Sequence, residues 1–227
     1  MTYIQITTRC NMSCEHCGMR CGKKGDDMSK AVWKKAVEFA ARYDSHISIG
    51  GGEPTMHKHF REFLLDAIGE CEDSPMFIAT NGSIKKHALL LAKLAKAGVI
   101  HAALSQDIWH DPISDEVVNA FTVGNGGSDD LREIRNVEKN VSAAGRAIDN
   151  DLSEDHRCIC SGWFFIDPLG NLKACGCEDS PIICNIMETP WESIDTILED
   201  LQDDDNSLGT ECWKDCKKLT EKVDLVA

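Results

Sequence analysis

Short runs rich in β-branched and apolar residues alternate with amphipathic segments along the first 145 residues of this chain. The runs cover residues 3–8, 46–54, 76–82, 99–107 and 131–138, and the amphipathic segments cover 28–43, 59–71, 85–98 and 113–121. Strands that alternate with helices of about a dozen residues are typical of βαβ units, whose strands are parallel. The order of elements therefore predicts an α/β fold with a parallel sheet.

The sequence changes character after about residue 147. Two short runs flank Pro168-Leu169-Gly170-Asn171, which is typical of a hairpin turn, and seven of the twelve cysteines lie beyond residue 147. A segment this short and rich in turns has little core of its own, so a metal site is a natural means of stabilising it. We therefore divide the chain into a domain over residues 1–147 and an extension over residues 148–227.

Composition excludes several classes of protein. With 42% hydrophobic residues the chain can form a core without disulfides, and no apolar stretch approaches the ~20 residues of a membrane helix. Residues 1–5 lack the basic start and apolar region of a signal peptide, so we expect a cytoplasmic protein whose cysteines serve metal or redox chemistry. The net charge of −14 argues against broad binding to duplex nucleic acid, which needs a basic face.

The densest group of cysteines directly follows the first predicted strand. Cys10, Cys14 and Cys17 form a C-x3-C-x2-C pattern, and Cys21 follows either as a fourth ligand or as a free thiol. Zinc sites favour paired C-x2-C units, whereas this loop offers three ligands in one tight turn. Three thiolates leave one position of a metal centre open, which is the arrangement that chemistry at the metal requires.

Polar motifs also end the next three predicted strands. The sequence "GGGEP" closes residues 46–54, "ATNG" closes 76–82 and "LSQD" closes 99–107. In the first motif the glycines permit close backbone approach and Glu53 can receive an ammonium group, although a simple tight turn is the alternative interpretation. The carboxyl ends of successive strands are where a (β/α) barrel assembles its active site.

Over residues 3–145 these motifs resemble those of the radical S-adenosylmethionine (radical SAM) enzymes. The resemblance implies a partial (β/α)6-type TIM barrel, followed by a small cysteine-rich β-hairpin plus helix as a C-terminal extension. It also implies a [4Fe–4S] cluster with an open iron site on Cys10, Cys14 and Cys17, with S-adenosyl-L-methionine (SAM) bound at the open iron. The residues that it assigns to cofactor binding are His16, Gly51, Gly52, Glu53, Asn81, Ser105 and Asp107.

The individual roles follow from the same resemblance. Gly51, Gly52 and Glu53 match the motif that binds the methionine amino group, and Ser105 and Asp107 match residues that reach the ribose and carboxylate of SAM. Asn81 is interpreted either as a turn residue or as a pocket contact. Four residues just beyond the strand ends either face the site or pack in the core or at the rim: Met56, His57, Trp109 and His110.

The extension resembles the cysteine-rich twitch (half-SPASM) segment of the same superfamily. The resemblance implies an auxiliary [4Fe–4S] cluster, and the ligands would be Cys158 or Cys160 together with Cys175, Cys212 and Cys216. A structural zinc on these cysteines is the alternative. Cys177 and Cys184 are either further ligands or filler, and Cys71 is interpreted as a small buried hydrophobic residue.

The implied function is reductive cleavage of SAM to a 5′-deoxyadenosyl radical. This radical would take hydrogen from a small-molecule, modified-base or peptide substrate, giving oxidation or isomerisation, and a flavodoxin- or ferredoxin-like reductant would supply the electron. The alternative is a non-enzymatic iron–sulfur electron carrier or a zinc-stapled binding module. Such a protein has no need of GGGEP or of Ser105 at a strand end.

Overall fold

All five strands predicted in the first 145 residues form, and they lie in one sheet. The computed structural model describes residues 1–43, 46–71, 75–122, 130–138, 141–142, 144–152, 164–173, 175–176 and 180–202. The parallel strands are β1 (Thr2–Thr7), β2 (Ile47–Gly51), β3 (Phe77–Thr80), β4 (His101–Ser105) and β5 (Arg132–Arg135). They run side by side in sequence order, as expected of consecutive βαβ units.

The extension continues this sheet on the other side of β1. Strand β6 (Phe164–Ile166) pairs in parallel with β1, and β7 (Asn171–Lys173) and β8 (Ile182–Asn185) follow in antiparallel register. The described residues thus form an eight-stranded sheet in the order β5-β4-β3-β2-β1-β6-β7-β8. The sheet therefore runs across the boundary predicted near residue 147.

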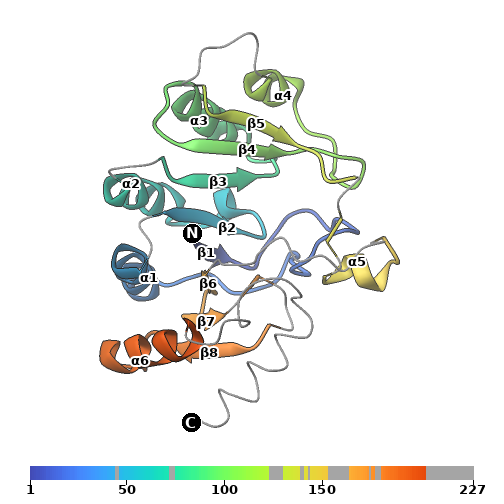
Figure 1. Cartoon of the computed structure of the whole chain (residues 1–227). Coiled ribbons are helices and arrows are strands. Elements are labelled where there is room, and N and C mark those ends of the chain that lie inside the picture. Colours follow the sequence, from blue (N-terminus) through green and yellow to red (C-terminus); the bar gives the residue numbers. More distant parts are fainter. Residues whose placement is uncertain are drawn as a thin grey trace.

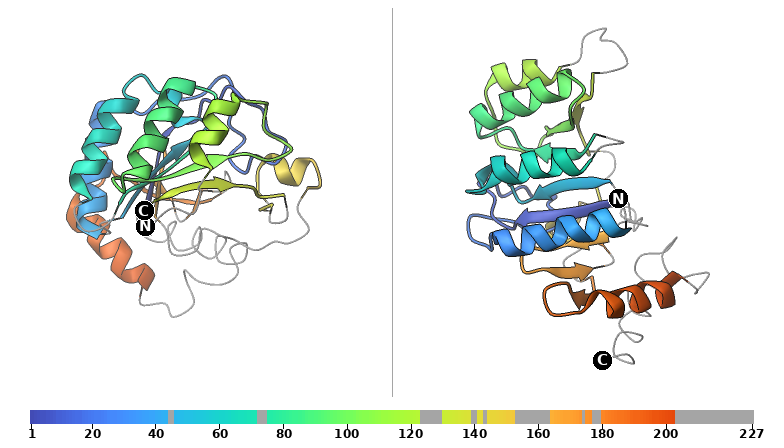
Figure 2. Two further views of the ribbon diagram at one scale, coloured as in Figure 1. Left: turned by 90° about the horizontal axis from the view of Figure 1, so that it is seen from above. Right: turned by 90° about the vertical axis from the view of Figure 1, so that its left-hand side faces the viewer.

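Within the residues that the structure describes, five helices lie on one face of the sheet. They are α1 (Lys30–Tyr43), α2 (Phe60–Glu70), α3 (Lys85–Lys96), α4 (Asp115–Phe121) and α6 (Trp191–Gln202), and Figure 2 shows them as an outer arc. Helix α1 begins where predicted because Ser29 Oγ accepts a hydrogen bond from Val32 N at 3.2 Å. Gly98, at φ +71°, terminates α3, and Val99 N donates to Leu94 O at 3.0 Å.

The core lies between these helices and the sheet. Ile4 of β1 and Ile49 of β2 are fully buried against Phe39 of α1 and Phe63 of α2. The fold class is as predicted: an α/β partial barrel with a hairpin and a helix at its C-terminal side. Within the described ranges, no helix has both the length and the apolar character of a membrane span.

Helix α6 attaches the extension to α1. Tyr43 Oη donates to Asp195 Oδ1 at 2.6 Å, and Arg42 also pairs with Asp195. Lys35 Nζ lies 3.6 Å from the ring centre of Trp191, a cation–π contact. The charged end of α1 therefore holds α6 against the barrel.

The functional motifs gather at the carboxyl edge of the sheet. In Figure 1 the loop after β1 and the short helix α5 (Arg146–Asp149) lie on the right, where the arrowheads of β3, β4 and β5 point. Because parallel strands share this edge, side chains from distant positions in the sequence come together there.

Candidate functional site

The loop after β1 carries the three motif cysteines and folds back on itself. Cys10 N donates to Gly22 O at 2.6 Å, and Thr8 N donates to Asp26 O at 2.9 Å. These bonds pair the start of the loop with its end. The thiols of Cys10, Cys14 and Cys17 then line one pocket.

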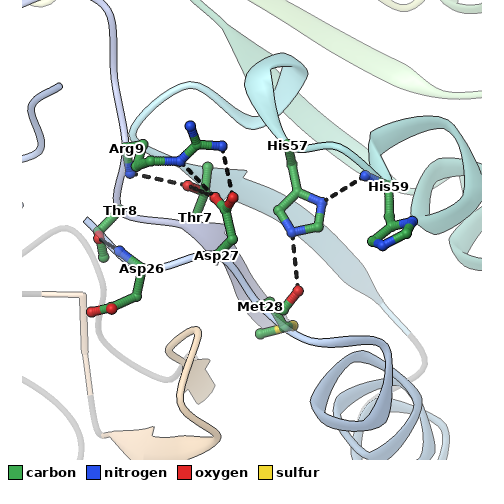
Figure 3. A network of polar contacts seen from close by, with 8 residues as sticks. All are labelled: Thr7, Thr8, Arg9, Asp26, Asp27, Met28, His57 and His59. Atoms are coloured by element: carbon green, nitrogen blue, oxygen red, sulfur yellow. Dashed lines mark hydrogen bonds and ion pairs between the residues drawn. The ribbon is translucent and has the colours of Figure 1, made fainter. Parts of the chain in front are cut away.

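An ion pair and a buried histidine fix the end of this loop (Figure 3). Arg9 contacts both carboxylate oxygens of Asp27, at 2.9 and 2.7 Å, and Thr7 Oγ1 donates to Asp27 Oδ1 at 2.7 Å. Burial acts to raise the pKa of Asp27, but the hydrogen bonds from Arg9 and Thr7 outweigh it and lower that pKa. His57 Nε2 donates to Met28 O at 3.0 Å, so His57 packs beneath the loop and does not line the pocket.

Helix α5 clamps the loop from the other side. Arg146 Nε donates to Cys14 O and Nη1 donates to Cys21 O, each at 2.9 Å, while Arg146 N donates to Cys17 O at 3.0 Å. Gly145 has φ +55°, and a Cβ there would lie 2.6 Å from Cys17 O. Only glycine permits this close approach of Gly145 to the cysteine loop. The approach places the Arg146 guanidinium group at the wall of the thiol pocket.

The glycines of the GGGEP motif allow β2 to turn tightly against the cysteine loop. A Cβ on Gly51 would lie 2.4 Å from Thr7 O, and a Cβ on Gly52 would lie 2.3 Å from Arg9 O. Glu53 N donates to Arg9 O at 2.8 Å. The motif is therefore a tight turn that also forms one wall of the pocket, and the role of Glu53 as the acceptor of an ammonium group stays a prediction.

Glu53 is fully buried, and its carboxylate is held by neutral donors. Oε1 accepts hydrogen bonds from Thr55 Oγ1 at 2.5 Å and Thr80 Oγ1 at 2.8 Å, and Oε2 accepts one from Asn81 N at 2.7 Å. Burial raises the pKa of Glu53. In the part of the chain that the structure describes, no basic side chain pairs with Glu53, so a cation entering the pocket would neutralise a buried charge.

Asn81 links the end of β3 to the first cysteine. Its Nδ2 lies 3.7 Å from Cys10 Sγ and donates to Asn11 Oδ1 at 3.1 Å, while its Oδ1 accepts from Ser83 N at 3.0 Å. Asn81 also lines the pocket. The residue therefore forms the turn and contacts the pocket at once.

At the end of β4, Ser105 lines the pocket and Asp107 lies behind it. The Asp107 side chain is 1% exposed, and Oδ1 accepts a hydrogen bond from His110 Nδ1 at 2.7 Å. Asp107 Oδ2 lies 3.6 Å from His16 Nε2. His16 and His110 both line the pocket, whereas Asp107 does not, so Asp107 influences the pocket through the two imidazoles.

The pocket has a volume of about 230 Å³. The predicted residues that line it are Cys10, Cys14, His16, Cys17, Gly51, Gly52, Glu53, Asn81 and Ser105. It is also lined by Tyr3, Met12, Cys21, His110 and Arg146, of which only His110 and Cys21 carried any signal in the sequence. Arg146 lies in a segment without motif or spacing to single it out.

The thiols show why this pocket suits a metal cluster. Burial and the neighbouring Cys10 and Cys17 raise the pKa of Cys14 to about 11, and burial raises the pKa of Cys10. A hydrogen bond from Cys21 and the charge of Arg146 lower the pKa of Cys17 to about 5. Three thiolates so close together repel one another, and iron ions would supply the opposite charge. The donor set therefore fits a [4Fe–4S] cluster.

The sequence matches the protein family described as "Radical SAM superfamily" over residues 4–146, which is more than half of the chain. The chain belongs to the radical SAM superfamily. A [4Fe–4S] cluster and SAM are the cofactors expected of its members.

Two curated relatives share 30% identity with this radical SAM chain. One is the tungsten-containing aldehyde ferredoxin oxidoreductase cofactor-modifying protein of Pyrococcus furiosus, matched over 120 residues, which are 51% of this chain and 32% of that protein. The other is the mycofactocin maturase MftC of Mycolicibacterium smegmatis, matched over 115 residues, 50% of this chain and 29% of that protein. The match thus spans about a third of each relative's length.

Two solved structures share the fold. BtrN in complex with AdoMet and 2-DOIA aligns with a TM-score of 0.64 at 19% identity, covering 88% of this chain and 84% of BtrN. The anSMEcpe structure with bound AdoMet and Cp18Cys peptide aligns with a TM-score of 0.51 at 13% identity, covering 99% and 96%. At these identities the likeness shows the fold alone, and it agrees with the partial barrel of the radical SAM superfamily.

The ligands predicted for an auxiliary cluster fall mostly outside the described residues. This is the case for Cys158, Cys160, Cys212 and Cys216, and for Cys177. Cys175 is described and is buried just after β7. Cys184 of β8 pairs with Leu172 across the sheet, and burial raises its pKa. Cys71, at the end of α2, packs against the core as predicted.

Proposed function

We propose that this chain is a radical SAM enzyme that holds a [4Fe–4S] cluster on Cys10, Cys14 and Cys17 and binds SAM beside it. With these groups bound, reductive cleavage of SAM supplies a 5′-deoxyadenosyl radical that takes hydrogen from a substrate C–H bond. The observation that carries this proposal is the shared pocket, in which the three thiols face a buried carboxylate that has no cationic partner among the described residues.

Different residues of the pocket bind different groups of SAM. Glu53 receives the methionine ammonium group, because a buried carboxylate gains most from a cationic partner. Gly51 and Gly52 let the end of β2 lie directly against the cysteine loop, since a side chain at either position would collide with that loop, and they thereby hold Glu53 at the pocket wall. Ser105 lines the pocket at the strand end, and its hydroxyl, which both donates and accepts, is proposed to bind the ribose.

The two imidazoles complete the far wall. His16 packs against Trp109 with ring centres 4.7 Å apart, and burial lowers the pKa of His16. His110 is oriented by Asp107 and lines the pocket, where its ring can meet a ligand. We assign His16 to the adenosyl side of the pocket, where a flat aromatic wall excludes water.

The substrate is proposed as a small molecule, a modified base or a peptide, and the reductant as a flavodoxin- or ferredoxin-like protein. The described pocket supports no narrower class. The relatives named as a cofactor-modifying protein and a maturase are consistent with this range. We also propose an auxiliary cluster on the cysteines of the extension. It would either accept an electron or stabilise the fold of the extension.

The test is anaerobic reconstitution with iron and sulfide, followed by SAM and dithionite and chromatography for 5′-deoxyadenosine. Production of 5′-deoxyadenosine by the reconstituted chain, and its loss in Cys17→Ala, supports the enzyme. A chain that binds its full complement of iron and is reduced, yet releases no 5′-deoxyadenosine, would be an electron carrier instead. One zinc and no iron would indicate a zinc-stapled module.

A further inference from the structure

The side-chain amide of Asn81 has a fixed orientation at the end of β3. Its Oδ1 accepts hydrogen bonds from Ser83 N at 3.0 Å and from Ser83 Oγ at 2.6 Å. A backbone N–H can only donate, so the amide oxygen must face Ser83 and the amide nitrogen must point the other way. The nitrogen is therefore directed at the loop after β1, which carries the motif cysteines.

The thiol of Cys10 lies on that side of the amide. Asn81 Nδ2 lies 3.7 Å from Cys10 Sγ, and it donates its other hydrogen to Asn11 Oδ1 at 3.1 Å. Met12 N donates to the same sulfur at 3.4 Å. Asn81 is 7% exposed and Cys10 is 8% exposed, so water competes little for these contacts. Cys10 Sγ thus accepts from one backbone donor and one side-chain donor, and a substitution can remove the second.

We propose that Asn81 is a positioning residue for the cluster, donating an N–H hydrogen bond to Cys10 Sγ while that sulfur ligates iron. This inference rests on the proposed assignment of the cluster to Cys10, Cys14 and Cys17. Hydrogen bonds to ligand sulfurs are among the main means by which a protein sets the reduction potential of an iron–sulfur cluster. A donor to Cys10 stabilises the additional negative charge of the reduced cluster, so it raises the potential and eases reduction.

The effect of Asn81 lies in the energy of the reduced state. The flavodoxin- or ferredoxin-like reductant loses one electron and the cluster gains it, and the amide keeps both of its protons. Because the hydrogen bond acts on a ligand sulfur, its effect is present before SAM binds. Measurements without SAM therefore separate this role from a direct contact between Asn81 and SAM.

The experiment compares the wild-type full chain with Asn81→Ala, which removes the donor, and Asn81→Asp, which keeps an acceptor for Ser83 N but has no N–H. Asn11→Ala is the matched control, because it removes the exposed partner of the same amide and leaves the contact with Cys10 in place. Each protein is reconstituted anaerobically, assayed for iron and sulfide, and titrated potentiometrically without SAM while EPR follows the reduced cluster. The Cys17→Ala chain identifies which signal belongs to this cluster.

A second readout reports the contact itself. Pulsed EPR on chains labelled with 15N-asparagine should detect a magnetic coupling between the reduced cluster and an asparagine nitrogen in the wild type. Asn81→Ala should lose this coupling, and Asn11→Ala should keep it. A purely structural role of Asn81 in the turn gives no reason for such a coupling.

We expect equal iron contents, a more negative midpoint potential in both Asn81 variants than in the wild type, and the wild-type potential in Asn11→Ala. If Asn81→Ala does not fold, a potential at or above the wild-type value in Asn81→Asp contradicts the proposal by itself. Unchanged potentials in both Asn81 variants overturn it. An equal shift in Asn11→Ala also overturns it, because distortion of the loop would then explain the shift.

Two further outcomes are decisive. Loss of iron from both Asn81 variants but not from Asn11→Ala overturns the proposal in favour of a purely structural role for the amide. A wild-type chain that forms no cluster overturns the proposed function itself. A wild-type chain that holds a cluster and cleaves SAM retains the proposed function, whatever the potentials of the variants.

Discussion

The carboxylate of Asp107 lies between two imidazoles, 2.7 Å from His110 Nδ1 and 3.6 Å from His16 Nε2. Its side chain is 1% exposed, so it does not reach the ligand pocket itself. The sequence predicted Asp107 as a direct contact of SAM. In the structure His110 lines the pocket and Asp107 accepts a hydrogen bond from its ring, and direct contact of Asp107 with SAM stays a prediction.

This relationship predicts non-additive effects on SAM affinity. Asp107→Asn and His110→Ala should each weaken binding by about 3- to 10-fold, the value of one hydrogen bond. The double variant should be no weaker than His110→Ala, because Asp107 acts through that ring. Equilibrium binding to the reconstituted proteins measures this, with Glu138→Gln as a control at an exposed carboxylate nearby. Additive losses would mean that Asp107 contacts the cofactor directly.

Binding of the cluster and cleavage of SAM should both require the three motif cysteines. Replacing Cys10, Cys14 and Cys17 by Ala should remove about four irons per chain and abolish formation of 5′-deoxyadenosine. Cys71→Ala should change neither quantity, since Cys71 does not line the pocket. Iron analysis and chromatography after anaerobic reconstitution provide the readouts. Undiminished cleavage of SAM by the triple variant would refute the cluster assignment.

Glu53→Gln should weaken SAM binding without loss of the cluster. The substitution keeps the volume of a fully buried side chain but removes its charge, and a charge-assisted hydrogen bond contributes roughly 1.5–3 kcal/mol, or about 10- to 150-fold in affinity. Iron content serves as the internal control, and Glu62→Gln, an exposed carboxylate on α2, as the matched variant. An unchanged dissociation constant would leave GGGEP with a structural role only.

The ion pair between Arg9 and Asp27 should make stability depend on pH in the acid range. Because the folded-state pKa of Asp27 lies below its ordinary value of 3.8, the pair stabilises the protein above pH 3.8 and is lost as pH falls below it. Asp27→Asn should cost about 1–2 kcal/mol at pH 7, reduced by the partial exposure of both side chains. Urea unfolding of the cluster-free chain should show that the difference in unfolding free energy between the wild type and Asp27→Asn becomes smaller below pH 3.8. A difference that stays constant down to pH 3 would contradict the assignment of the ion pair.

The extension should carry its own metal. The wild-type chain should bind about eight irons and no stoichiometric zinc, and Cys212→Ala with Cys216→Ala should reduce this to about four. The double variant should also become sensitive to protease beyond residue 147, because the metal closes long loops in a segment with little core. Cleavage of SAM should persist in that variant. One zinc with four irons in the wild type would mean that the extension holds a structural zinc and no auxiliary cluster.

The sheet and most of the site could be predicted because they depend on local patterns. Short apolar runs that alternate with amphipathic segments mark the strands, and the positions of Cys10, Glu53 and Ser105 at strand ends follow from the order of elements. Arg146 could not be predicted, because its contacts depend on how α5 docks against a loop far away in the sequence. His57 lies three residues after GGGEP, yet the backbone turns its ring to Met28 O, a choice of direction that spacing does not reveal.

The pairing of β6 with β1 has a consequence for biosynthesis. Tyr3 stacks on Phe165 with ring centres 4.9 Å apart, so the first strand obtains its second neighbour only after β6 (Phe164–Ile166) has been made. Pairings between such distant segments form slowly. A nascent chain emerging from the ribosome therefore presents its cysteine loop on an incomplete sheet edge, and loading of iron at that stage would compete with aggregation and oxidation of the unshielded thiols.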